Sequence, residues 1–67
     1  MPRYRVQLYS AGAAELTGPM ILEAGDAKIA AEIAAGEPLH PEGAMENFRA
    51  KVWLVDAHLA NIYEFWR

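Results

Sequence analysis

Two histidines and the acids near them are the residues best suited to acid–base or metal chemistry. His40 and His58 both fall in segments rich in turn-forming residues, and a metal site needs further ligands besides them. The nearest acids that could serve are Glu37, Glu42 and Asp56. Histidines in exposed loops are more often solvated side chains than metal ligands. We therefore expect no metal site.

Nucleophilic catalysis also lacks a recognisable pattern. Asp56 and His58 are close enough in sequence to form an acid–base pair, but no nucleophile stands at a matching spacing. Ser10 and Thr17 lie among small residues with no partner specified. The glycines match neither a P-loop nor a dinucleotide-binding fingerprint. We expect neither catalytic residues nor a cofactor, and enzyme activity is a weak hypothesis.

Composition narrows the class of protein further. The chain has 67 residues, 54% of them hydrophobic, and no cysteine. This length suits one domain, residues 1–67, and the apolar content is too high for a disordered segment. Without cysteines there are no disulfides, thiolate metal ligands or thiol nucleophiles, which favours a reducing compartment. Because no apolar stretch resembles a signal peptide or a spanning helix, we expect a soluble cytoplasmic protein.

Two segments in the first part of the chain have the pattern of strands. Residues 3–9 alternate, with Tyr4, Val6 and Leu8 on one side and more polar residues on the other, as in a half-buried strand. Residues 10–18 are small and predict a loop. A Gly-Pro turn then precedes an apolar run at residues 20–23, which predicts a second strand.

A short helix is predicted over residues 27–35. Asp26 is a good N-cap, five alanines favour the helical backbone, and Gly36 suits a left-handed C-cap. Ile29 and Ile33 lie four positions apart on one face, and we expect them to dock the helix on the sheet. The following polar connection, residues 37–47, is long for so small a domain and predicts a mobile or functional loop.

The last part of the chain predicts a β-hairpin. Residues 48–55 and 60–66 form its strands, with a turn at residues 56–59. A two-residue loop at Ala57-His58 gives a register in which every facing pair is chemically compatible. It places Arg49 opposite Trp66, Ala50 opposite Phe65, Lys51 opposite Glu64, Val52 opposite Tyr63 and Trp53 opposite Ile62.

These elements predict an α+β domain, a three- to four-stranded antiparallel sheet in β-β-α-β-β order with one short helix packed on one face. Ala30 would join the two isoleucines on the helix side of the core. The predicted sheet residues of this core are Tyr4, Val6, Leu8, Met20, Leu22, Val52, Leu54, Tyr63 and Phe65.

A resemblance supports the same order. The stretch from Ile21 to Ala34, ILEAGDAKIAAEIA, is similar to a pattern in short uncharacterised bacterial and phage domains, and the Met-Pro-Arg-Tyr opening resembles them too. In that pattern a strand ends in Glu-Ala, an acidic cap follows, and a helix repeats alanine on its buried side. The resemblance implies a β-β-α-β or β-β-α-β-β order and transfers no functional residue. The hairpin that carries both tryptophans has no counterpart in it.

The face of the sheet opposite the helix is the one functional clue. Monomers rarely expose large apolar patches, and tryptophan and arginine are enriched at binding hot spots. We expect this face to mediate homodimerisation or, second, the binding of another protein. Stacking of single-stranded nucleic acid is the alternative, disfavoured by the net charge of −3. The predicted partner-binding residues are Arg3, Arg5, Tyr9, Arg49, Lys51, Trp53, Ile62 and Trp66.

Overall fold

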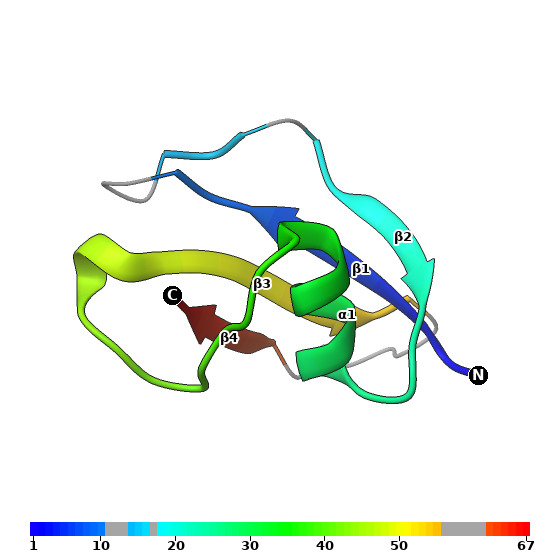
Figure 1. Ribbon diagram of the computed structural model, residues 1–67. Coiled ribbons are helices and arrows are strands. Elements are labelled where there is room, and N and C mark those ends of the chain that lie inside the picture. Colours follow the sequence, from blue (N-terminus) through cyan, green and yellow to red (C-terminus); the bar gives the residue numbers. More distant parts are fainter. Residues whose placement is uncertain (11–13, 17, 56–61) are drawn as a thin grey trace.

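A four-stranded antiparallel sheet with one helix on one of its faces makes up the fold (Figure 1). The computed structural model describes residues 1–10, 14–16, 18–55 and 62–67. Its strands are β1 (Arg3–Leu8), β2 (Met20–Glu23), β3 (Phe48–Leu54) and β4 (Tyr63–Trp66). The helix is α1 (Ala27–Ala35), and a short 3₁₀ turn, η1 (Met45–Asn47), precedes β3. The predicted α+β class and element order are confirmed.

The strands lie in the spatial order β2-β1-β3-β4. The alternating N-terminal strand, β1, is therefore central and pairs with both β2 and β3. Val6 lies between Met20 on one side and Val52 on the other, so apolar side chains run across the face that α1 covers. Among the described residues, no helix is long and apolar enough to cross a membrane.

The helix begins and ends where its capping residues predict. The Asp26 carboxylate accepts a hydrogen bond from the Ile29 N–H at 2.8 Å. Gly36 adopts a left-handed conformation, with φ of 73°, and its N–H donates to the Glu32 carbonyl at 2.8 Å. Any other L-residue would be strained at that φ, so the glycine fixes the end of α1.

The buried face of α1 differs from the prediction. Ala27, Ala30 and Ala31 face the sheet and are buried, whereas Ile29 is 44% exposed and Ile33 is 60% exposed. Alanine lets the helix axis approach the sheet closely, and a β-branched side chain at the contact would hold it farther away. The prediction that the two isoleucines dock the helix was wrong.

The core is centred on the middle of the sheet. Tyr4, Val6, Val52 and Phe65 are buried as predicted, and Leu8 and Leu22 pack at its margin. Met20, Leu54 and Tyr63 are exposed instead, at 39%, 36% and 43%. A nine-residue helix is about 14 Å long. It covers the centre of the sheet and leaves these peripheral side chains uncovered.

The polar connection after α1 contributes to the core. Leu39 is fully buried, and its N–H donates to the Glu32 carboxylate at 3.0 Å. The next residue, His40, pairs with Trp66 through two backbone hydrogen bonds of 2.7 Å each. Glu37 also forms an ion pair with Arg67 at 3.1 Å. The connection is therefore docked on the helix and along the outer edge of β4.

The hairpin register is partly confirmed. Ala50–Phe65, Lys51–Glu64 and Val52–Tyr63 pair as predicted. An irregularity between Phe48 and Ala50 makes Phe48, not Arg49, the partner of Trp66. The regular pairing ends at Val52–Tyr63, so the predicted Trp53–Ile62 pair is not formed within the named strands, and Val55 lies in a turn. The predicted turn, the start of the returning strand at residues 60–61, and His58 lie outside the described residues.

Candidate functional site

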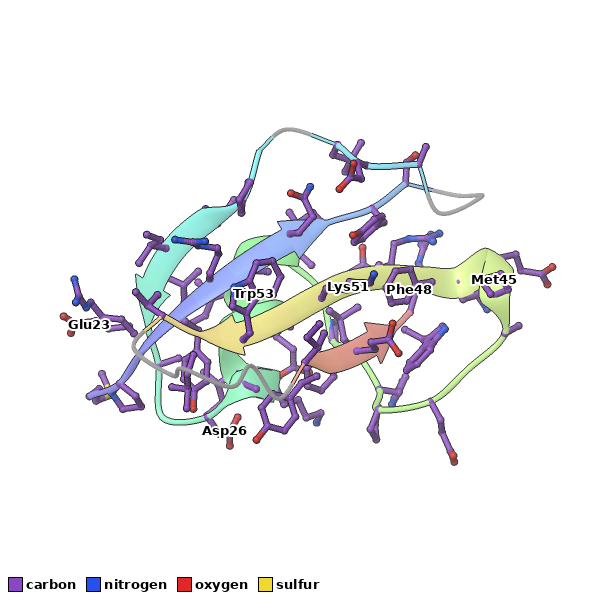
Figure 2. The ribbon with its side chains drawn as sticks, turned by 180° about the vertical axis from the view of Figure 1, so that it is seen from behind. Glu23, Asp26, Met45, Phe48, Lys51 and Trp53 are labelled. Atoms are coloured by element: carbon purple, nitrogen blue, oxygen red, sulfur yellow. The ribbon has the colours of Figure 1, made fainter. Side chains whose placement is uncertain are left out.

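The face of the sheet that α1 leaves uncovered is defined by the strand register. Residues paired across antiparallel strands point to the same side, and Phe48, Lys51 and Trp53 mark this side along β3 (Figure 2). We call it the outer face. Its members are Arg3, Arg5, Gln7, Tyr9, Ile21, Glu23, Phe48, Lys51, Trp53, Glu64 and Trp66.

The irregularity at the start of β3 brings three aromatic rings together. A bulge inserts one residue into a strand and reverses the side on which the residues before it point. Phe48 thereby joins the outer face, with its ring centroid 4.8 Å from that of Tyr9 and 5.5 Å from that of Trp66. Both ring pairs are tilted, within the range in which aromatic contacts are favourable. Tyr9 and Phe48 are buried and Trp66 is half-buried.

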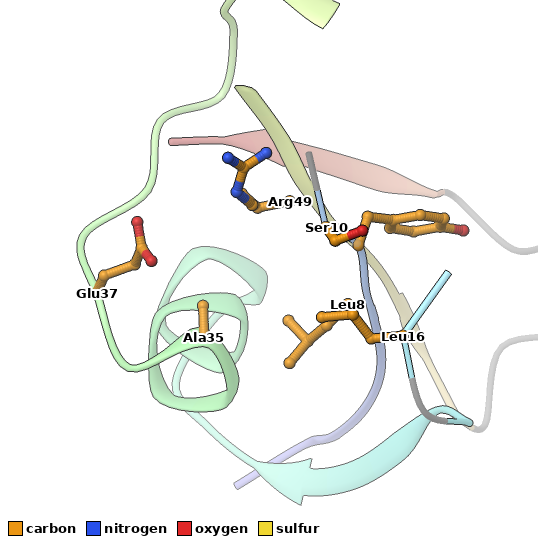
Figure 3. Close-up of a pocket in the computed structure, with 7 residues that line it drawn as sticks. Leu8, Ser10, Leu16, Ala35, Glu37 and Arg49 are labelled. Atoms are coloured by element: carbon orange, nitrogen blue, oxygen red, sulfur yellow. The ribbon is translucent and has the colours of Figure 1, made fainter. Parts of the chain in front are cut away.

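The same irregularity moves Arg49 off the outer face. Its Nη1 atom donates to the Glu46 and Phe48 carbonyl oxygens at 3.0 and 2.9 Å. With Leu8, Ala35 and Glu37 it lines a hollow of about 220 Å³ on the side of α1 (Figure 3). The prediction that Arg49 lies on the face opposite the helix was wrong, because the alternation breaks between Phe48 and Ala50.

The aromatic cluster lines a second hollow of about 320 Å³ on the outer face. We call it the aromatic hollow, and its lining residues are Tyr9, Met45, Phe48, Lys51, Glu64 and Trp66. The Lys51 ammonium lies 5.9 Å from the centre of the Tyr9 ring, a cation–π distance. Lys51 and Glu64 are neighbours across β3 and β4, so the hollow carries one charge of each sign.

The connection before β3 sets the position of Trp66. His40 holds the Trp66 backbone, and Gly43 lies directly against its side chain. A Cβ atom on Gly43 would stand 2.7 Å from the Trp66 Cβ and 3.1 Å from Cγ. Only glycine leaves room for the indole at this place.

Replacing Gly43 by alanine is therefore expected to displace the Trp66 side chain. Gly43 does not have a positive φ, so the strain arises from the methyl contact and not from the backbone. Overpacking of this kind costs about 1–3 kcal/mol of unfolding free energy. Urea unfolding measures the loss, and the tryptophan emission spectrum should shift. The control is Gly18→Ala, because no atom lies within 4 Å of a Cβ placed there. Equal stability of the two variants would contradict the contact.

Charges of both signs alternate on the outer face. Arg3 pairs in register with Glu23, and Lys51 with Glu64. Since Arg49 lies elsewhere, the bases on this face are Arg3, Arg5 and Lys51. The sequence placed four bases on this face, Arg3, Arg5, Arg49 and Lys51, whereas the structure shows three bases together with Glu23 and Glu64.

The other predicted residues lie apart from the hollow. Trp53 is half-buried and neighbours Arg5 across β1 and β3, whereas Ile62 is 55% exposed and lies before β4 begins. In the described part of the chain, no group of three acidic or histidine side chains could hold a metal ion.

Sequence reasoning missed Phe48, Met45 and Gly43. Strict alternation from Val52 places Phe48 on the helix side, and nothing in the residues around Arg49 marks the bulge. Comparisons of the chain with protein-family models, curated proteins and solved structures gave no match. What the domain does is therefore argued from its own surfaces.

Proposed function

We propose that this domain is a protein-association module whose aromatic hollow receives an apolar side chain of a partner protein. The observation that carries the proposal is the contact of Tyr9, Phe48 and Trp66 around an open hollow. Pockets for small molecules usually measure about 300–1,000 Å³, so this one is at the lower end of that range. It suits one side chain better than a larger ligand.

The residues of the hollow fit a protein partner. Aromatic anchors in desolvated pockets account for much of the affinity of protein interfaces. Because Tyr9 and Phe48 are already held by packing, binding would not have to order them. Met45 is 74% exposed on η1, and its unbranched thioether can adapt to side chains of different shape.

The charge around the hollow favours a neutral occupant over a nucleotide. Lys51 is matched by Glu64, and Arg49, which sequence reasoning placed here, lines the opposite side of the sheet. The Glu64 carboxylate beside the aromatic rings would repel the phosphates of a nucleic acid. Proteins that bind single-stranded nucleic acids instead present a positively charged groove. The nucleic-acid alternative therefore loses its main support.

Self-association through the outer face stays a prediction. A two-fold contact requires one patch to supply both the hollow and the side chain that fills it. Among the apolar residues lining the hollow, Tyr9 and Phe48 are buried and Met45 is 74% exposed. A separate protein with a protruding leucine or phenylalanine fits the hollow more simply.

A titration with capped amino acids tests the proposal. We expect N-acetyl-leucinamide and N-acetyl-phenylalaninamide to shift the NMR signals of the Trp66 indole N–H and the Met45 methyl group. Met45→Ala should weaken this binding about fivefold, a typical effect at an interface residue. Met20→Ala is the matched control, because Met20 is also exposed but lies on β2.

Two results would count against the proposal. One is the absence of any shift at Trp66 and Met45 when the capped amino acids are added. The other is preferential binding of a single-stranded oligothymidylate that displaces them and weakens steeply with salt, which would restore the nucleic-acid alternative.

A further inference from the structure

The two edges of the sheet are protected unequally. The outer edge of β4 is covered near its end by the backbone of His40, which exchanges two hydrogen bonds with Trp66. The outer edge of β2 has no such cover from the described residues, and β2 lies at the end of the sheet in Figure 1. An uncovered edge strand presents unpaired N–H and C=O groups to another chain.

The backbone groups that β2 presents can be identified. The Ala24 N–H donates to the Pro2 carbonyl at 3.2 Å, so Ala24 points its backbone groups toward β1. In an antiparallel ladder this direction alternates, which turns Leu22 toward β1 as well. Ile21 and Glu23 therefore direct their N–H and C=O groups away from the sheet.

The side chains of this edge lack the usual protection against pairing. Met20 and Ile21 are 39% and 52% exposed, and neither a lysine nor a bulge interrupts the strand. Pro19 stands before the strand and leaves its outward donors intact. Glu23 is the one charged side chain within β2, whereas protected edges usually carry a lysine, a proline or a bulge within the strand.

The flank of α1 nearest this edge is also apolar. Lys28 and Glu32 lie on the flank toward Leu39, where the Glu32 carboxylate holds the connection to β4. Ile29 and Ile33 lie on the opposite flank and are both exposed. Because the chain after Leu39 pairs with β4 at one end of the sheet, this opposite flank is the one nearer β2. Met20, Leu22 and these isoleucines thus form one apolar strip that borders an open row of hydrogen-bonding groups.

We infer that a second copy of this chain pairs antiparallel with β2 about a two-fold axis that passes beside Leu22. Ile21 of each copy then exchanges two backbone hydrogen bonds with Glu23 of the other. Leu22 faces its symmetry mate, and Met20 faces Ala24 of the other copy. The two sheets join into one, and the apolar side chains of both β2 strands fill the space between the two helices.

The charges of the outer face agree with this register. Across the joined sheet, the row of side chains runs from Arg3 to Glu23 in one copy and then to Ile21 and Arg5 in the other. Glu23 of one copy thus has Arg3 of its own copy on one side and Ile21 of the other copy on the other side. Arg5 of the other copy is the next residue in the row. No like charges stand opposite each other, as self-complementary pairing requires.

Charge substitution at Ile21 tests both the dimer and its register. Sedimentation of the full chain over about a hundredfold range of concentration should show a monomer–dimer equilibrium. Ile21→Glu places an acid opposite Glu23 of the other copy but beside Arg5 in its own sheet, so the fold tolerates it. We expect it to raise the dimer dissociation constant at least about tenfold. Ile21→Gln, the uncharged matched control, should dimerise as well as the unmodified chain, and Glu23→Gln should rescue Ile21→Glu.

A backbone probe does not depend on side-chain charge. Chemical synthesis of the chain with N-methylated Ile21 removes one outward donor per copy without touching the β1–β2 ladder, and it should weaken the dimer. Hydrogen exchange at the Ile21 and Glu23 amides should slow as the concentration rises. A chain that stays monomeric throughout would overturn the inference. So would a dimer unaffected by Ile21→Glu and by N-methylation, or one abolished by Met45→Ala. The first two outcomes leave the proposal for the aromatic hollow unaffected, and the third would assign the dimer contact to the hollow. The hollow has its own test with the capped amino acids.

Discussion

Leu39→Ala is expected to remove a large part of the stability of this domain. Leu39 is fully buried, and truncating a buried leucine to alanine costs about 2–5 kcal/mol of unfolding free energy. At about 0.05–0.15 kcal/mol per residue, a domain of 67 residues has an unfolding free energy of about 3–10 kcal/mol in total. The variant should show a marked population of unfolded chains at 25 °C. Urea unfolding followed by circular dichroism measures the loss.

The control for this prediction is Ile33→Ala. Leu39 lies in a polar connection and Ile33 in an apolar helix, so the sequence alone ranks their importance the other way round. Because Ile33 is 60% exposed, its truncation should change the unfolding free energy by less than about 0.5 kcal/mol. The two variants are compared at a concentration where the chain is monomeric. Equal losses would show that Leu39 does not anchor the connection.

Phe48→Ala is expected to be at least as destabilising. Its ring is 6% exposed and contacts both Tyr9 and Trp66 on the outer face. Truncating a buried phenylalanine costs about 3–5 kcal/mol, of which each aromatic pair contributes about 0.5–1.5 kcal/mol. Thermal unfolding should therefore show a strongly lowered midpoint, and the near-ultraviolet circular dichroism of the tryptophans should weaken.

Phe48→Leu separates the structural part of this effect from the binding part. Leucine keeps most of the buried apolar volume and removes the aromatic ring, so we expect a smaller loss of about 1–2 kcal/mol. The variant should remain folded and bind the capped amino acids more weakly than the unmodified chain. Tyr63→Ala, an exposed aromatic on β4, is the control and should leave that binding unchanged. If Phe48→Leu binds the capped amino acids as tightly as the unmodified chain, the Phe48 ring does not contribute to the proposed site.

The elements of this fold were predictable because local rules determine them. Alternation in residues 3–9 marked β1, and Asp26 and Gly36 marked the ends of α1. The facing pairs Lys51–Glu64 and Val52–Tyr63 followed from chemical compatibility across a hairpin. In each case the signal lies within a few residues or between two adjacent segments.

The features that sequence reasoning missed depend on contacts between distant segments. Which flank of α1 is buried depends on how closely the helix approaches the sheet. Both alanine and isoleucine occur at such contacts, so the sequence does not decide between them without the helix–sheet distance. The bulge that exchanges Phe48 and Arg49 is favoured by the fit of three rings drawn from β1, β3 and β4. Leu39 is one apolar residue in a polar loop, and its burial follows from the pairing of the next residue with β4.

The position of β1 at the centre of the sheet has a consequence for biosynthesis. Its neighbour β3 follows it in the sequence only after β2, α1 and η1, so β1 leaves the ribosome well before this partner does. Until then β1 has only β2 as a partner, and an isolated pair of strands is at best marginally stable in water. The nascent chain should therefore not reach its native structure until β3 has emerged from the ribosome. Folding should be slow for a chain of this size, since pairing of remote segments lowers the rate.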